Sequence, residues 1–118
     1  MAKVTVYGIP NCDTTKKAMG WLKKQKIDFS FHDYKTAGIG KEKLEEWISK
    51  AGLNTVFNKR STTWKELSAA EQKKGSDKNG AVRLMMENTS IIKRPIIEAG
   101  KELLVGYQED QYNKHLKQ

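Results

Sequence analysis

The chain has 118 residues, 37% of them hydrophobic and 31% charged, a composition typical of one compact globular domain, here spanning 1–118. Cys12 is the only cysteine, which excludes an internal disulfide, a two-cysteine redox motif and any metal site built from several cysteines. No uncharged stretch is longer than 4–12, so we expect no transmembrane segment, no signal-peptide core and a cytoplasmic, reducing environment.

The net charge is +8, but the 22 basic residues include only three arginines, Arg60, Arg83 and Arg94. Lysine is a strongly hydrated point charge, whereas arginine forms the paired hydrogen bonds that recognise phosphates and base edges. The lysines of segment 16–26 are therefore typical of a solvated helix face, with a positive field around Cys12 as the alternative. Because there is no arginine-rich face, we do not expect direct nucleic-acid binding.

The first third of the chain predicts a strand, a helix and a second strand. Residues 3–7 alternate and are rich in β-branched side chains, which favours a strand. Apolar residues then recur at helical spacing from Cys12 to about Gln25. Segment 27–32 alternates apolar and polar residues and predicts the second strand. Cys12 is therefore expected at the turn from the first strand into the first helix.

Residues 36–88 contain no strand pattern and predict a helical insertion. One helix is expected to end at Gly52, which follows apolar residues at helical spacing. Two capping-box spacings, beginning at Thr63 and Ser68, predict the starts of short helices. A further helix fits 77–88.

The last third predicts two strands and a helix. Apolar residues at 91–97 and 103–105 flank a turn at 99–101, and segment 109–117 has helical spacing. The order is therefore βαβ, a helical insertion and ββα, which is an α/β fold.

Cys12 has polar neighbours that argue against its burial as a small apolar residue. A thiol at a helix start faces unpaired backbone N–H groups, which favour an anion. A free thiol has a pKa of about 8.5, and a helix dipole lowers it by at most about 1.5 units. A mostly ionised thiol therefore needs another fixed cation, for which Arg60 and Arg94 are the candidates. Arg83, amid lysines on a predicted helix, is expected at the surface.

Several separated segments resemble the ArsC/Spx family, the arsenate-reductase-like branch of thioredoxin-fold proteins. The similarity is closest to the YffB-like subgroup of glutathione-dependent thiol reductases and spans nearly the whole chain. The segments that carry it are Tyr7–Thr14, Lys16–Ala18, Trp21–Leu22, Arg60–Trp64, Leu84–Met85, Ile92–Ile96 and Val105–Tyr107.

The resemblance implies a role for each matching residue. Cys12 is the implied nucleophile, and Arg60 and Arg94 are implied to bind the anionic substrate and stabilise the thiolate. Pro95 is implied to follow a cis peptide bond. Substrate or glutathione contacts are expected from four residues: Asn11, Asp13, Thr14 and Pro95.

The resemblance also implies the partners. Glutathione is the expected co-substrate, and the expected partners are glutathione or glutaredoxin and a small anionic or disulfide substrate. No tightly bound cofactor is expected, and His32 and His115 are too isolated to build a metal site. We expect a monomer.

Two departures separate the chain from better-known relatives. Arsenate reductases of this family carry a histidine where this chain has Gly8, and a third arginine near Gly106. Spx-type regulators carry a two-cysteine switch, which the segment Cys12–Thr15 cannot form. The alternatives to a glutathione-dependent thiol reductase are an arsenate reductase coupled to glutaredoxin and a non-enzymatic regulator that binds RNA polymerase. Gly52 matches a glycine that helps Spx-type proteins contact the polymerase.

Overall fold

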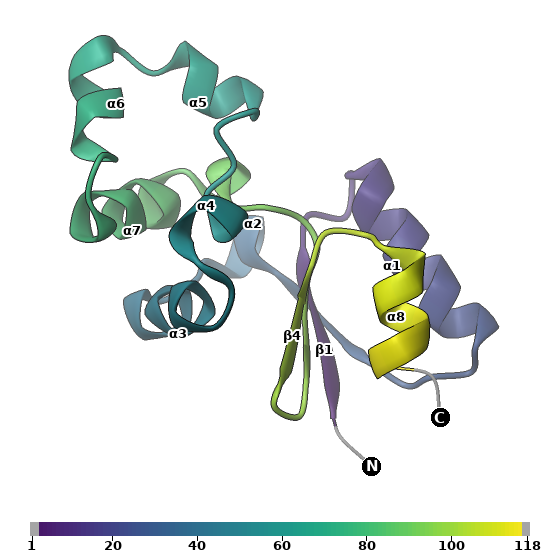
Figure 1. Cartoon of the computed structure of the whole chain (residues 1–118). Coiled ribbons are helices and arrows are strands. Elements are labelled where there is room, and N and C mark those ends of the chain that lie inside the picture. Colours follow the sequence, from purple (N-terminus) through teal and green to yellow (C-terminus); the bar gives the residue numbers. More distant parts are fainter. Residues whose placement is uncertain (1–2, 117–118) are drawn as a thin grey trace. The chain divides into compact units, whose positions relative to one another are not determined.

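The structure is a computed structural model that describes residues 3–116, and its chain divides into two compact units (Figure 1). The first unit consists of the residues up to Ala37 together with those from Arg94 onward, and the second unit is Gly38–Lys93. The predicted insertion, 36–88, covers most of the second unit. That the whole chain is a single domain stays a prediction.

The first unit is built around a four-stranded sheet in the order β2-β1-β3-β4. Strand β1 pairs in parallel with β2 and antiparallel with β3, and β4 pairs antiparallel with β3. The βαβ–ββα order confirms the predicted α/β, thioredoxin-like arrangement. The elements of this unit are β1 (Val4–Gly8), α1 (Asp13–Lys24), β2 (Ser30–Asp33), α2 (Tyr34–Ala37), β3 (Ile96–Ala99), β4 (Glu102–Val105) and α8 (Glu109–His115).

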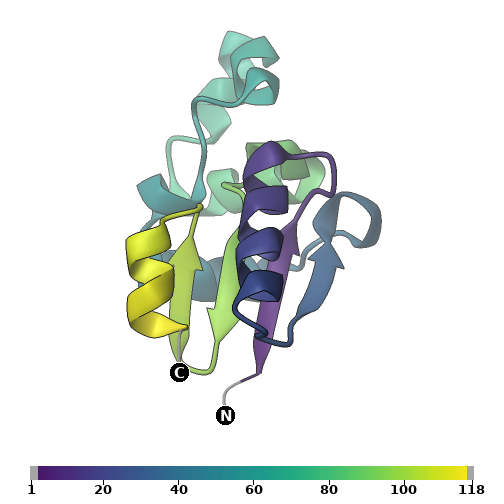
Figure 2. The same ribbon diagram turned by 90° about the vertical axis from the view of Figure 1, so that its right-hand side faces the viewer.

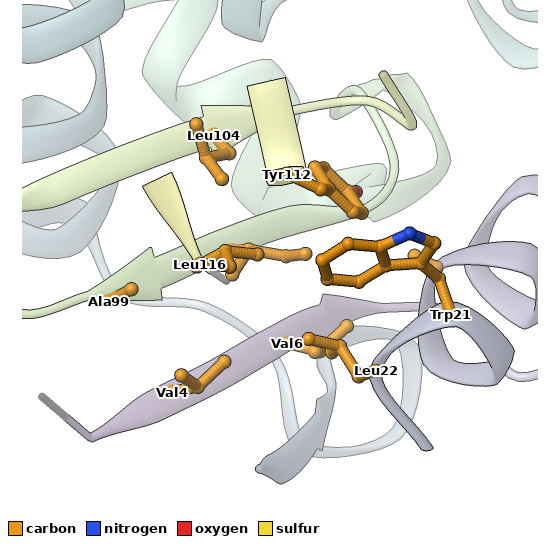
Figure 3. Packing of buried hydrophobic residues seen from close by; sticks show 10 residues of the cluster. Val4, Val6, Trp21, Leu22, Ala99, Leu104, Tyr112 and Leu116 are labelled. Atoms are coloured by element: carbon orange, nitrogen blue, oxygen red, sulfur yellow. The ribbon is translucent and has the colours of Figure 1, made fainter. Parts of the chain in front are cut away.

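Helices α1 and α8 cover the same face of the sheet (Figure 2). The rings of Trp21 from α1 and Tyr112 from α8 meet edge to face with centroids 5.4 Å apart (Figure 3). The Tyr112 hydroxyl donates a hydrogen bond to the Gly106 carbonyl at 2.7 Å. The predicted last helix reaches Lys117, which lies outside the described residues. The buried cluster beneath the helices contains Val4, Val6, Ala18, Trp21, Leu22, Ile97, Ala99, Leu104, Tyr112 and Leu116.

Strand β2 is shorter than the alternation of segment 27–32 predicts, because the end of α1 uses the first of these residues. The Ile27 N–H donates to the Leu22 carbonyl at 2.9 Å, and Lys26 has a φ of 59°. This C-terminal cap orients the backbone of Ile27 toward the helix. Pairing with β1 therefore begins only at Ser30, opposite Thr5.

The second unit is helical, as predicted. Helix α3 ends before Gly52, which has a φ of 93°. Helix α4 follows at once and was not predicted, and a single bridge joins Phe57 to Ile92. No helix of the described residues is both long enough and apolar enough to cross a membrane. The elements of this unit are α3 (Lys41–Ala51), α4 (Leu53–Val56), α5 (Thr62–Glu66), α6 (Ala69–Lys74), α7 (Lys78–Glu87) and the 3-10 helix η1 (Thr89–Ile91).

The predicted helix caps are partly confirmed. The Ser68 hydroxyl accepts from the Glu71 N–H at 3.2 Å and starts α6, as the capping box predicts. The predicted cap Thr63 is wrong, because α5 starts two residues earlier: the Ser61 hydroxyl accepts from the Trp64 N–H at 3.1 Å. Trp64 packs edge to face on Phe57, seven residues earlier, with ring centroids 5.0 Å apart, a contact that the capping-box spacing does not contain.

Substitution by alanine is expected to change the free energy of unfolding in opposite directions at two helical glycines. A Cβ at Gly80 in α7 would lie 1.6 Å from the Lys74 carbonyl oxygen, whereas a Cβ at Gly20 in α1 would meet no atom within 4 Å. We expect Gly80→Ala to lower the free energy of unfolding by about 3 kcal/mol through overpacking. Gly20→Ala is expected to raise it by up to about 1 kcal/mol through helix propensity. Urea denaturation of both variants measures the change in the free energy of unfolding. Equal changes in the two variants contradict the close packing of Gly80 against the Lys74 carbonyl.

Candidate thiol site

Cys12 occupies the position immediately before α1, at the turn that leaves β1. Its backbone is extended, with φ −87° and ψ 125°, so it is the N-cap residue of the helix. The Cys12 N–H donates to the Ile9 carbonyl at 3.1 Å, and its carbonyl accepts from the Lys16 N–H at 2.9 Å. The thiol is free and half-buried. The structure thus places the sulfur at the N-terminus of the helix, where backbone N–H groups have no helical acceptor.

The surroundings of the thiol favour its ionised form. Partial burial raises the pKa of Cys12, but several donors lower it further than burial raises it. These donors are the Thr15 backbone N–H and hydroxyl, the Thr14 backbone N–H and the Arg94 side chain. The net result is a pKa below the ordinary value of a cysteine thiol.

The Thr15 hydroxyl is a buried polar group that faces the sulfur. Thr15 has 0% exposure, and its Oγ1 has no geometrically acceptable hydrogen-bond partner among residues 3–116. The same hydroxyl is nevertheless close enough to Cys12 to lower the pKa of the thiol. Because a thiolate is a better acceptor than a neutral thiol, ionisation of Cys12 supplies what this hydroxyl otherwise lacks.

Gly8 makes room for Thr15. A Cβ at Gly8 would lie 2.8 Å from Thr15 Oγ1 and 3.0 Å from Thr15 Cγ2. A buried β-branched side chain has little freedom to move aside. The absence of a side chain at the end of β1 is therefore what allows a threonine at this place in α1.

Arg94 is the arginine that the structure brings to the thiol. It is half-buried and lies two residues before β3, and the Arg94–Pro95 bond is cis, as the resemblance implies. The Pro95 carbonyl accepts from the Gly106 N–H at 2.7 Å. The Arg94 side chain hydrogen-bonds both Cys12 and the hydroxyl of Tyr34. Tyr34, which directly follows β2, is a site residue that the sequence did not predict.

For the other residues expected to contact a substrate, the binding role stays a prediction. Arg60 is exposed in the second unit, and its backbone N–H donates to Asn58 Oδ1 at 3.1 Å. Asn11 and Asp13 are exposed beside Cys12, and the Thr14 side chain is half-buried. Among residues 3–116, no cluster of three or more His, Cys, Asp or Glu side chains is arranged to hold a metal ion.

Thr15→Val tests the electrostatic role of the hydroxyl. We expect alkylation of Cys12 by iodoacetamide at pH 7 to slow roughly three- to tenfold, because the thiolate loses one hydrogen-bond donor. At a pH at which the thiol is protonated, the free energy of unfolding of the variant is expected to be about 1 kcal/mol higher than that of the wild type. The reason is that the substitution removes a buried hydroxyl without a partner. Thr5→Val, the same change in β1, is the control.

The sign of the pH dependence follows from the lowered pKa of Cys12. A thiol whose pKa is lower in the folded state adds stability above its unfolded pKa, and this contribution disappears as the pH falls through the folded value. The stability gained by Thr15→Val is therefore expected to shrink as the pH rises. A gain that is constant with pH, or an alkylation rate equal to wild type, contradicts the role assigned to Thr15.

Gly8→Ala tests the packing against Thr15. We expect it to lower the free energy of unfolding by about 2 kcal/mol, because the added Cβ overlaps a buried side chain. Combining it with Thr15→Ala relieves the overlap, so the double variant loses less than the sum of the two single losses. Additive losses, measured by urea denaturation, contradict the direct contact.

Comparison with known proteins gives one consistent result. The model of the ArsC family matches residues 7–115. The solved structure of a protein named YffB is 40% identical, covers 97% of this chain and 99% of that protein, and superposes with a TM-score of 0.90. An arsenate reductase (ArsC) related protein from Brucella melitensis is 37% identical, with coverages of 98% and 96% and a TM-score of 0.73.

A regulator is also similar. The global transcriptional regulator Spx of Streptococcus pyogenes serotype M6 is 28% identical over 115 residues, which cover 96% of this chain and 84% of Spx. Because the family model spans nearly the whole length, including Cys12 and Arg94, the chain belongs to the ArsC family.

Proposed function

We propose that this chain is a glutathione-dependent monothiol oxidoreductase with Cys12 as its nucleophile. The observation that carries the proposal is the environment of the sulfur: backbone N–H groups of α1, the Thr15 hydroxyl and the Arg94 side chain together keep its pKa low. A structural cysteine has no need of such donors, whereas a nucleophilic one does, since the thiolate is the reacting species.

The proposed reaction is a pair of thiol–disulfide exchanges. The Cys12 thiolate attacks one sulfur of a substrate disulfide, the substrate S–S bond breaks, and the departing thiolate takes a proton from water. The half of the substrate that was attacked stays bound to Cys12 as a mixed disulfide. A glutathione thiolate then attacks that half, so that Cys12 leaves again as a thiolate. The resolving thiol comes from outside, because the chain contains no second cysteine.

Glutathione fits this site because it is an anion with a thiol. Its carboxylates suit charge-assisted hydrogen bonds from arginine, for which we propose Arg94 and Arg60. The exposed polar residues beside the sulfur, Asn11 and Asp13, together with Thr14, are proposed to contact the peptide. Pro95 is proposed to present the backbone next to it. Glutaredoxin is an alternative protein partner that supplies the same thiol chemistry.

Mass spectrometry after incubation with glutathione disulfide tests the proposal. We expect a single glutathionyl adduct on Cys12 and none on Cys12→Ser. Arg94→Ala is expected to form the adduct about tenfold more slowly, because the thiolate and the anion lose a charge-assisted hydrogen bond. Arg60→Ala reports separately on the second proposed arginine. Arg83→Ala is the matched control, because Arg83 is exposed on α7. Absence of an adduct on the wild-type chain contradicts the proposal.

Two alternatives keep a specific observation in their favour. Similarity to an arsenate reductase related protein favours arsenate as the substrate, but the chain lacks the histidine and the third arginine expected of such enzymes. Similarity to Spx favours a regulator that binds RNA polymerase. Retention of polymerase subunits on both wild-type and Cys12→Ala protein, without adduct formation, supports the regulator and contradicts the reductase.

A further inference from the structure

Three segments of the first unit bring Cys12, Arg94 and Tyr34 to the same end of the sheet. Gly8, the last residue of β1, pairs with Asp33, the last residue of β2, so Tyr34 begins where β2 ends. On the other side of β1, Tyr7 pairs with Ile96, the first residue of β3. The residues just before β3 therefore lie beside the turn that follows β1, and these residues include Arg94.

Tyr34 is buried and touches a charged group. Its exposure is 0%, and its hydroxyl is hydrogen-bonded to the Arg94 side chain. A guanidinium has donors only, so Arg94 donates to the phenol oxygen, and it donates to the Cys12 sulfur as well. One arginine thus connects a buried hydroxyl to the half-buried thiol.

The Tyr34 hydroxyl stays protonated over the pH range in which the Cys12 thiol titrates. Burial raises the pKa of Tyr34 far above its ordinary value, more than the opposing charge of Arg94 lowers it. The charged groups of Cys12 and Asp33 raise it further. Tyr34 is therefore a neutral acceptor for the guanidinium at any pH at which the thiol titrates, and it does not compete with the sulfur for a proton.

The backbone of Tyr34 is fixed as well. The carboxylate of Asp33 accepts from the Lys35 N–H at 3.0 Å and from the Thr36 N–H at 3.4 Å. It also accepts from the Thr36 hydroxyl at 2.8 Å. These bonds hold the first turn of α2, which packs against β1 and β2. The phenol therefore offers Arg94 an acceptor at a defined place.

We propose that Tyr34 is a positioning residue that holds the Arg94 guanidinium against the Cys12 sulfur. An arginine side chain loses much rotamer freedom when it is held in one place, and this loss has an entropic cost. A second fixed acceptor lowers the part of that cost that the contact with the thiolate has to offset. Tyr34 acts through Arg94 and not on the reacting sulfur. The inference rests on the proposed function, since it assigns Tyr34 a part in preparing the same nucleophile.

Tyr112 is the control that distinguishes the positioning of Arg94 from a general contribution of a buried tyrosine to stability. It is also a buried tyrosine of the first unit, with 1% exposure, and its hydroxyl donates to the Gly106 carbonyl at 2.7 Å. Its hydroxyl therefore binds a neutral backbone group, whereas that of Tyr34 binds the arginine of the thiol site. Replacing either residue by phenylalanine removes one buried hydroxyl and one hydrogen bond.

The test is the rate of Cys12 alkylation by iodoacetamide as a function of pH, for Tyr34→Phe and Tyr112→Phe. We expect Tyr34→Phe to slow alkylation at pH 7 roughly threefold and to move the midpoint of the profile to higher pH. Tyr112→Phe is expected to leave both unchanged. In an Arg94→Ala background, Tyr34→Phe is expected to have no further effect. An unchanged profile in Tyr34→Phe, or an equal change in the Arg94→Ala background, overturns the proposal.

A measurement on the wild-type protein covers the case in which Tyr34→Phe does not fold. The side-chain N–H signals of Arg94 in a nitrogen-15 NMR spectrum, identified by their loss in Arg94→Lys, are expected to exchange with water at least threefold more slowly than those of Arg60 and Arg83, which are exposed. Equal exchange overturns the proposal. Neither measurement uses glutathione, so failure to form the glutathionyl adduct contradicts the proposed function without affecting this result.

Discussion

The sulfur of Cys12 depends on donors that the fold supplies from two directions. Partial burial opposes ionisation, and the first N–H groups of α1 reverse that effect. The Thr15 hydroxyl and, to a smaller extent, the Arg94 side chain lower the pKa of the thiol further. Arg94 reaches the sulfur only because β3 pairs antiparallel with β1 in the register that sets Tyr7 opposite Ile96. The strand register of the first unit therefore determines that the arginine contributes to the electrostatics of the thiol.

The thiol site contains a buried hydroxyl, that of Thr15, in a position that is unfavourable for stability alone. Most buried hydroxyls have a hydrogen-bond partner, and a catalytic or redox role is one explanation for an exception. Thr15 is such an exception: its fully buried Oγ1 has no partner of acceptable geometry among residues 3–116, yet the same hydroxyl lowers the pKa of Cys12. The neutral thiol form is thereby made less stable relative to the thiolate.

The order of elements could be predicted because each depends on local patterns. Helix starts, the glycine stop at Gly52 and the alternating strands are all encoded within a few residues. The error at α5 arises because packing, and not the capping-box spacing, selects among nearby hydroxyls: Trp64 packs on Phe57, and Ser61 rather than Thr63 becomes the cap. The site shows the same limit. Cys12 is evident from its neighbours, whereas the burial of Tyr34 against Arg94 follows from strand pairing and has no local signal.

The contact between Gly8 and Thr15 bears on how such sites diverge within the ArsC family. The resemblance implies a histidine at the position of Gly8 in arsenate reductases of the family, but a Cβ at this position would lie 2.8 Å from Thr15 Oγ1. A histidine therefore cannot enter this site while residue 15 stays threonine and the backbone keeps its place. The two positions of this chain are therefore coupled, and a larger residue at position 8 requires a smaller one at position 15. The packing of β1 against α1 thus limits which side chains can stand next to Thr15, the residue whose hydroxyl lowers the pKa of Cys12.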